Sequence, residues 1–263
     1  MERLIYHVDV NSAYLSWEAT EQLRHGAETD IRKIPAIIGG DTAKRKGVVL
    51  AKSIPAKKYG IRTGEPVTDA LKKCPGLKSF SPDFALYKKY SHAFIQILEK
   101  YAPVVEQVSI DEAYLDMSGL HYFYENETDA ARLIQTEIRD TLGFTVNIGI
   151  SNCKVLAKMA SDFEKPDKIH TLFPDEIEEK MWPLPVRELF FTGAAAAAKL
   201  NSLGIQTIGD LAKSDVAFLK SHLKSQGEVL WRYANGLDDS PVRQEREQSR
   251  RPSGLRKTTN PDN

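Results

Sequence analysis

Two short apolar segments in the middle of the chain flank a pair of neighbouring acidic residues. Residues 104–108 and 113–117 are rich in β-branched and alternating apolar residues, and Asp111 and Glu112 stand between them. This pattern predicts a tight β-hairpin with both acids at its turn. Because adjacent side chains on a strand point to opposite faces, the two carboxylates converge only where the backbone bends or a metal ion draws them together. A solvated acidic turn is the alternative that these residues leave open.

A third acid follows the first predicted strand. Residues 4–10 form a β-rich run that places Asp9 at its C-terminal tip. Residues 12–24 then show the apolar spacing of a helix. Glycines and prolines break residues 26–81 into short pieces, which we interpret as a small insertion.

Beyond the insertion, the pattern predicts a helix, the hairpin, a second helix and a strand. The helices are expected over 83–101 and 128–142, the second closed by Gly143, and the strand over 144–150. The apolar side of the first helix, expected to be buried, comprises Phe84, Tyr87, Tyr90, Phe94, Ile97 and Leu98. Without the insertion, this order is the split βαβ arrangement of an α+β fold with a ferredoxin-like sheet.

The predicted topology has a chemical consequence for the three acids. In a ferredoxin-like sheet the first and third strands are antiparallel neighbours, so Asp9 is expected beside Asp111 and Glu112. Three carboxylates at adjoining strand ends form an open, oxygen-rich site suited to Mg²⁺. Two such ions would activate an attacking hydroxyl and stabilise a leaving pyrophosphate, which gives the hypothesis of nucleotidyl transfer.

Basic residues follow the last predicted strand. A helix expected over 152–164 and stopped by Pro166 carries Lys158, and Lys165 stands at its end. We expect Lys158 on a solvated face of this helix. Lys165 would reach the acids if the helix packs against the sheet.

From about residue 172 the pattern predicts only short helices. Residues 191–194 and 199–205 have the form of a helix-hairpin-helix, in which backbone N–H groups at a helix start bind a phosphate. The alanine run 194–198 lacks the lysine or hydroxyl that would strengthen this contact. From about residue 238, prolines, a glycine and arginines without apolar periodicity predict an exposed linker.

Composition narrows the class of protein. Lys+Arg and Asp+Glu both total 36, so any argument for a nucleic-acid partner rests on where the basic residues lie. They form two clusters: Lys44, Arg45, Lys46, Lys52, Lys57, Lys58 and Arg62, and then Arg243, Arg246, Arg250, Arg251, Arg256 and Lys257. Two cysteines and the absence of a leader-like start indicate a reduced, cytoplasmic protein. No apolar run approaches the roughly 20 residues that cross a membrane.

Four stretches together resemble the Y-family, or translesion, DNA polymerases of the DNA polymerase IV and UmuC type. They are residues 9–14 (DVNSAY), 109–116 (SIDEAYLD), 149–158 (GISNCKVLAK) with Lys165-Pro166, and 203–211 (LGIQTIGDL). The resemblance covers about residues 4–236.

The resemblance implies a palm at residues 1–12 and 80–170, inserted fingers at 13–79, a thumb at 171–238 and a linker at 239–263. It implies a monomer that adds dNMP from dNTP to a primer 3′-OH on template DNA, in tolerance of DNA damage. A little-finger domain and the sliding-clamp contact would lie beyond this chain, so we expect a catalytic core with weakened DNA binding.

Site residues carry over by position. Asp9, Asp111 and Glu112 would be catalytic and would ligate two Mg²⁺ ions, with the carbonyl of Val10 as a further ligand. Tyr14 stands where the family has the aromatic steric gate that excludes a ribose 2′-OH. The alternative for Tyr14 is a core aromatic on its helix.

Lysines would bind the incoming triphosphate. Lys165 matches the family lysine with this role, and Lys57 stands where many members carry an arginine. Ile54 replaces the tyrosine three residues earlier and cannot donate a hydrogen bond, so Lys52 is a candidate to assist.

Two other functions stay open on the sequence. A catalytically weak, DNA-bound scaffold of the same family is favoured by Ile54 and the alanine run 194–198, whereas the three acids oppose it. A nucleotidyl cyclase with a ferredoxin-like sheet would have no use for the helical C-terminal part.

Overall fold

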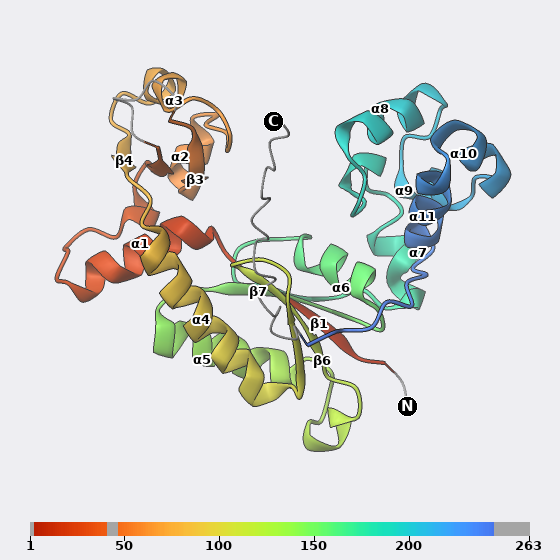
Figure 1. Cartoon of the computed structure of the whole chain (residues 1–263), viewed down its shortest axis with the longest axis horizontal. Helices are drawn as coiled ribbons and strands as arrows, with labels where there is room; N and C mark the ends of the chain where they lie inside the picture. Colours follow the sequence, from red (N-terminus) through yellow and green to blue (C-terminus); the bar gives the residue numbers. More distant parts are fainter. Residues whose placement is uncertain (1–2, 41–46, 245–263) are drawn as a thin grey trace, which may run out of the picture.

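A five-stranded sheet forms the centre of the molecule, and two smaller bodies stand above it, one at the upper left and one at the upper right (Figure 1). The computed structural model describes residues 3–40 and 47–244. The sheet order is β5-β6-β1-β7-β8. Its strands are β1 (Ile5–Val10), β5 (Val104–Gln107), β6 (Glu112–Asp116), β7 (Val146–Ser151) and β8 (Ile169–Thr171).

Four of these strands have the ferredoxin-like order expected from the sequence. β1 pairs antiparallel with β6 on one side and with β7 on the other, and β5 pairs antiparallel with β6. β8 adds a parallel edge strand beside β7 that the sequence did not predict. A strand of three residues is too short to show a hydrophobic period.

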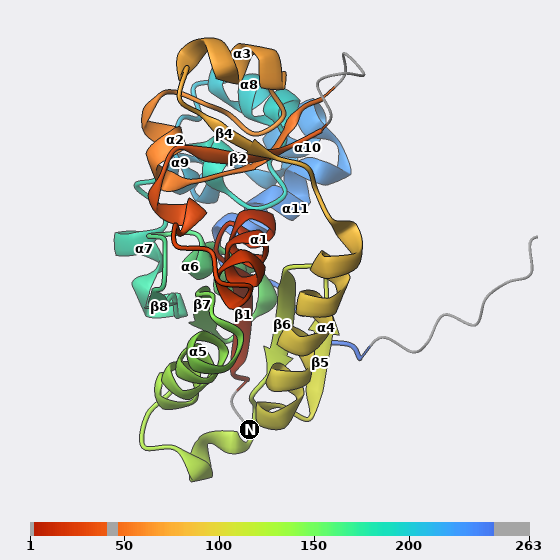
Figure 2. The same cartoon turned by 90° about the vertical axis from the view of Figure 1, so that its left-hand side faces the viewer.

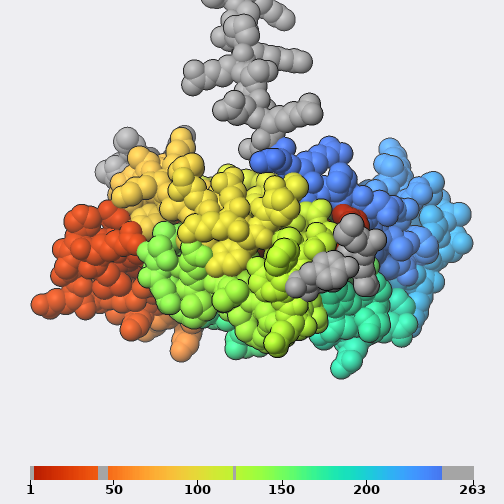
Figure 3. Space-filling model, turned by 90° about the horizontal axis from the view of Figure 1, so that it is seen from below, coloured from red at the N-terminus to blue at the C-terminus, as the bar shows by residue number. Residues whose placement is uncertain are grey.

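Two long helices cover one face of the sheet. These helices are α4 (Phe84–Tyr101) and α5 (Asp129–Leu142). They share a core with Tyr6, Val8 and Val10 of β1. Alternate residues of a strand point to the same face of the sheet, so these three side chains all face the two helices. Seen from below, the surface of this region spreads across the middle of the molecule in yellow and light green (Figure 3).

The ends of these helices compare closely with expectation. α5 ends at Gly143, whose φ of 83° is the left-handed conformation typical of a helix C-terminus.

Phe84 was expected on the buried side of α4, but it is 52% exposed at the first position of that helix.

The other face of the sheet is covered by α6 (Lys154–Ser161), which contacts β1 and β7. Gly149 of β7 makes this close approach possible. A Cβ atom there would lie 1.9 Å from the carbonyl oxygen of Ala157 and 2.4 Å from the backbone nitrogen of Ser161. Any side chain at residue 149 would therefore push α6 off the sheet.

The insertion folds into a small body after α1 (Ala13–Arg24). It has a sheet of order β3-β2-β4 and a separate core. Its elements are β2 (Ala36–Gly39), β3 (Val49–Lys52), α2 (Ile54–Lys58), α3 (Val67–Lys73) and β4 (Lys78–Phe80). The sequence predicted an insertion but no sheet, because strands of three or four residues show little alternation. Lys44, Arg45 and Lys46 of the first basic cluster lie outside the described residues.

The C-terminal body consists of short helices, as expected. They are α7 (Ile177–Lys180), α8 (Ala194–Ser202), α9 (Ile208–Ala212), α10 (Val216–Leu223) and α11 (Ser225–Ala234). Val155, Leu156 and Met159 of α6 belong to the core of this body. α6 is therefore packed between the sheet and the C-terminal helices.

The segment from residue 238, expected to be an exposed linker, is mostly exposed in its described part, but it is anchored to the sheet and to α6. Asp238 accepts a hydrogen bond from the backbone of Val155, at the start of α6, at 3.0 Å. Val242 is 8% exposed, and the backbone N–H of Arg243 donates to Glu106 on β5 at 2.7 Å. These partners are far away in the sequence, so no local pattern reveals them. The segment emerges beside β5 (Figure 2).

Two further expectations concern the second basic cluster and membrane-spanning helices. The rest of the second basic cluster, Arg246, Arg250, Arg251, Arg256 and Lys257, lies outside them. Within 3–40 and 47–244, no helix combines the length and apolar character that a membrane span requires.

Candidate active site

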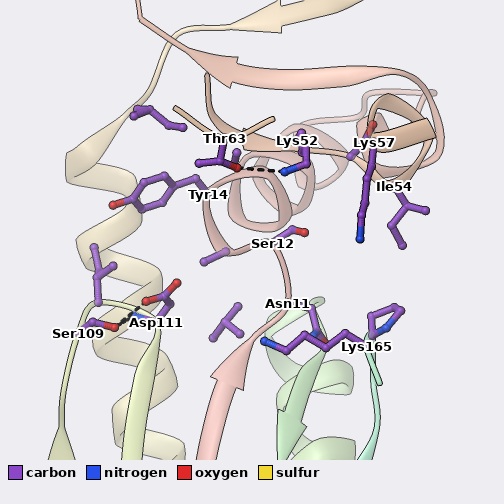
Figure 4. Close-up of a pocket in the computed structure, with 17 residues that line it drawn as sticks. Asn11, Ser12, Tyr14, Lys52, Ile54, Lys57, Thr63, Ser109, Asp111 and Lys165 are labelled. Carbon is purple, nitrogen blue, oxygen red and sulfur yellow. Dashed lines mark hydrogen bonds between the residues drawn. The ribbon is translucent and has the colours of Figure 1, made fainter. Parts of the chain in front are cut away.

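A cavity of about 580 Å³ lies where β1 ends, beneath the small three-stranded body. Lys52, Lys57 and Thr63 line it from above, and Asn11, Asp111 and Lys165 line it from below (Figure 4). Tyr14 closes one side. The cavity therefore brings together residues from four separate parts of the chain.

Strand pairing places the predicted acids together, as the topology required. Asp9 on β1 is directly opposite Glu112 on β6, so their side chains share the face that α6 covers. The backbone N–H of Val10 donates to the carbonyl of Asp111 at 3.0 Å. Asp9 and Glu112, which are about a hundred residues apart in the chain, thus lie opposite each other at one end of two neighbouring strands, next to the backbone of Asp111.

Lysines from α6 and the loop after it neutralise two of these acids. Asp9 binds the ammonium of Lys165, which also binds Asp162 at 2.9 Å. Glu112 accepts a hydrogen bond from Lys158 at 3.0 Å. The prediction that Lys158 is solvated is wrong, since its side chain is only 14% exposed. α6 is buried on two sides, against the sheet and against the C-terminal helices. The spacing of apolar residues in its sequence does not reveal the second buried side.

A buried histidine that the sequence analysis missed completes this cluster. His7 has no exposed surface, and its Nδ1 lies 2.8 Å from Ser161 Oγ. Its Nε2 lies 3.5 Å from Glu112 Oε2 and has no hydrogen-bond partner among the described residues. The signal was present in the sequence: His7 stands two residues before Asp9 on the same strand, and therefore faces the same side.

The surroundings shift the proton affinities of the two buried acids in opposite directions. Burial raises the pKa of Asp9, against the opposing charge of Lys165. The neighbouring imidazole of His7 and the ammonium of Lys158 lower the pKa of Glu112 to about 2. Glu112 therefore stays ionised at any ordinary pH, whereas burial favours the neutral form of Asp9.

Asp111 has a different environment. Its carboxylate is partly exposed, lines the cavity and accepts a hydrogen bond from Ser109 Oγ at 2.6 Å. It approaches the cavity from the side opposite Lys165 (Figure 4). Asp111 is thus the one of the three acids that faces the cavity directly.

The donor set suits a hard divalent cation. Asp9, Asp111 and Glu112 offer carboxylate oxygens, and Val10 offers a backbone carbonyl, which are the ligands Mg²⁺ prefers. Over 3–40 and 47–244, no three His, Cys, Asp or Glu side chains are gathered closely enough to hold an ion. Joint binding therefore requires the acids to turn away from their present partners, and the strand pairing already holds Asp9 opposite Glu112.

Tyr14 both packs and lines the cavity. Its ring stacks on Tyr87 of α4 with centroids 4.6 Å apart and an angle of 12° between planes. Phe84 meets it edge-on at 6.1 Å. The aromatic contacts hold the ring in place beside the cavity.

Asn11 ties the loop of Lys165 to the end of β1. Its side-chain oxygen accepts hydrogen bonds from the backbone of Asp167 at 3.0 Å and from Thr145 Oγ1 at 2.9 Å. Its amide donates to Asn147 at 3.1 Å. The sequence analysis gave Asn11 no role, because all three partners are remote in the chain.

Comparisons with known proteins find clear similarities. A model described as the impB/mucB/samB family matches residues 8–162. "DNA polymerase IV" of Clostridium acetobutylicum is 51% identical over 248 residues, which are 94% of this chain and 62% of that protein. "DNA polymerase IV" of Cronobacter sakazakii is 36% identical over 97% of this chain and 70% of its own length.

Solved structures give the same result. A Y-family DNA polymerase chimera superimposes with a TM-score of 0.82 at 26% identity, covering 92% of this chain and 70% of its own. DinB from Sulfolobus solfataricus gives a TM-score of 0.80 at 26% identity, with 91% and 69% covered. The chain spans between 59% and 62% of the length of three curated relatives named "DNA polymerase IV".

Proposed function

The chain belongs to the impB/mucB/samB family of Y-family, or translesion, DNA polymerases, and on this premise we propose that it adds dNMP from dNTP to a primer 3′-OH on template DNA. The pairing of Asp9 with Glu112, beside the backbone contact between Val10 and Asp111, carries the proposal. Val10 and Asp111 line a cavity of about 580 Å³, large enough for a nucleotide, and Asp9 and Glu112 lie at the adjoining strand ends.

We assign the parts of the molecule on the same premise. The palm would be residues 1–12 and 80–170, which hold the central sheet, α4, α5 and α6. The fingers at 13–79 would contain the small three-stranded body and α1. The thumb at 171–238 would be the C-terminal helices, followed by the segment from 239.

Asp9, Asp111, Glu112 and the carbonyl of Val10 would hold Mg²⁺ in this function. When bound, two ions supply Lewis-acid activation of the primer hydroxyl and stabilisation of the leaving pyrophosphate. The protein's own contribution is a fixed backbone, because strand pairing holds Asp9 opposite Glu112 whatever occupies the cavity.

Other residues would select and orient the nucleotide. Tyr14, held by its stacking on Tyr87, would exclude a ribose 2′-OH from the cavity. Lys165 and Lys57 would bind the triphosphate. α8 begins at Gly193 without a side-chain cap, so its free backbone N–H groups are available to a DNA phosphate.

Partners follow from the family. One similar structure is titled a ternary complex of Dbh with partially disordered substrates. We propose primer-template DNA and dNTP as the substrates of this chain, which would act as a cytoplasmic monomer in damage tolerance. A sliding clamp would be a further partner of the longer family members.

Primer extension with Mg²⁺ tests the proposal. The wild type should extend a primed template, and Asp111→Asn should lower the rate by at least about 10²-fold, since one carboxylate ligand is lost. Asp140→Asn, on the exposed far side of α5, is the matched control and should extend normally.

Other products would identify the alternatives. DNA binding without extension by the wild type would overturn the polymerase and support the scaffold. A cyclic nucleotide formed without template would support the cyclase.

A further inference from the structure

The roof of the cavity carries two lysines whose charge the described part of the protein does not neutralise. Lys52 ends β3 and Lys57 lies in α2, and both line the cavity. Among residues 3–40 and 47–244, neither has a carboxylate oxygen within 4.0 Å, whereas Lys73 of the same small body binds Glu65 at 2.5 Å. The roof therefore presents positive charge to the cavity.

Lys52 is held in place despite this lack of a carboxylate. Its ammonium donates to Thr63 Oγ1 at 3.1 Å (Figure 4). Burial and the charge of Lys57 both lower the pKa of Lys52. Glu65 acts on it in the opposite direction, but Glu65 already binds Lys73. An ammonium that is partly desolvated beside a second ammonium is stabilised when an anion binds between them.

The backbone under Lys52 is fixed as well. The next residue, Ser53, is 2% exposed and caps α2 by accepting from the backbone of Ala56 at 3.1 Å. Its hydroxyl also donates to the carbonyl of Ile34 at 2.7 Å. Lys52 thus projects from a rigid strand-to-helix junction, so its backbone is already in place before a ligand binds.

Ile54 leaves this part of the cavity without another donor. Its side chain is 54% exposed and lines the cavity, yet it offers no hydrogen bond. On the opposite side, Lys165 is shared between Asp9 and Asp162. Lys52 and Lys57 are therefore the cations of the cavity that are least compensated by the described residues.

We propose that Lys52, oriented by Thr63, binds the triphosphate of the incoming nucleotide together with Lys57, in the place where Ile54 provides no donor. This rests on the proposed polymerase function for the identity of the nucleotide. The polyphosphate chemistry rests only on the two cations and the cavity they face.

The test measures polyphosphate binding without catalysis. Calorimetry on the full 263-residue chain would compare inorganic tripolyphosphate and each dNTP, at fixed Mg²⁺ and ionic strength. Lys52→Ala should weaken tripolyphosphate binding about tenfold, because a charge-assisted hydrogen bond is lost. The tripolyphosphate affinity of Lys52→Arg should stay near that of the wild type. The affinity of Lys52→Gln should lie between those of the wild type and Lys52→Ala. Thr63→Val should weaken binding about threefold through loss of orientation.

Lys58→Ala is the matched control, since Lys58 is an exposed neighbour that does not line the cavity. It should bind tripolyphosphate as the wild type does. Thermal unfolding of each variant would check that the small body stays folded.

Three results would overturn the proposal. They are unchanged tripolyphosphate affinity in folded Lys52→Ala, a loss confined to dNTPs of one base, and no measurable tripolyphosphate binding by the wild type. Failure of the wild type to extend a primer would instead refute the polymerase function, and Lys52-dependent tripolyphosphate binding would still support a polyphosphate site. The two failures are therefore distinguishable.

Discussion

The acids at the strand ends below the cavity and the lysines in its roof have opposite charges and differ in how those charges are compensated. Asp9 and Glu112 each bind a lysine, from a loop and a helix packed against the sheet. Within the part of the chain that the structure describes, Lys52 has only the hydroxyl of Thr63 as a partner. Charge that is compensated within the protein contributes to the fold, whereas charge left uncompensated is available to a ligand. We expect substitutions on the two sides to separate stability from binding.

The largest difference should appear in catalysis. Asp9→Asn should lower primer extension by at least about 10²-fold at saturating dNTP, because a carboxylate of the reaction centre is lost. Lys57→Met should raise the KM for dNTP about tenfold with a smaller change in kcat, since it removes one charged contact. Steady-state kinetics checks this contrast. Equal effects on kcat and KM in both variants would remove the proposed division of roles.

The next effect concerns the position of α6. Gly149→Ala should destabilise the protein by about 3 kcal/mol, because the added Cβ meets the backbone of Ala157 and Ser161. Urea unfolding measures it. Gly76→Ala is the control, because no atom lies within 4 Å of a Cβ built there. If both variants unfold at the same urea concentration, the close approach of α6 to β7 is not required.

The same substitution on the two sides of the cavity gives a smaller, direct comparison. Lys158→Met should destabilise the fold by about 1–3 kcal/mol, because it leaves Glu112 partly buried without its cation. Lys57→Met should change stability by no more than about 0.5 kcal/mol, since Lys57 is exposed. Chemical denaturation distinguishes them, and a larger loss at Lys57 would reverse our interpretation of the roof.

The pH dependence of stability should show the smallest effect. Because the pKa of Glu112 is lowered from 4.5 to about 2, its contribution is complete above about pH 4.5 and is lost as the pH falls toward 2. Glu112→Gln should therefore flatten the decline in stability over this range. Glu178→Gln, at an exposed position, is the control. A decline as steep in Glu112→Gln as in the wild type would contradict the role of His7 and Lys158.

The sequence predicted the arrangement of the acids at the strand ends better than it predicted their surroundings. The hydrophobic pattern predicts the order of strands and helices along the chain, and that order indicates a ferredoxin-like sheet. In such a sheet the strands that carry Asp9 and Glu112 are neighbours, and the structure places the two residues opposite each other. Lys158 was misplaced because a helix buried on two sides has no solvated face. The sheet of the small body was missed because its strands are too short for a period.

Contacts between distant residues account for the rest. His7 binds Ser161, and Asn11 binds the backbone of Asp167, across separations of 154 and 156 residues. No local pattern encodes such pairs, which appear only when the sheet and α6 are in place. The functional roles of all the predicted site residues stay predictions: Asp9, Val10, Tyr14, Lys57, Asp111, Glu112 and Lys165.

The segment that follows α11 affects how the molecule bears load. Since Asp238 caps α6 and Arg243 is bound to Glu106 on β5, tension applied to the chain after residue 243 reaches the sheet before it reaches the C-terminal helices. Traction from that direction would therefore be resisted by the sheet that carries the acids.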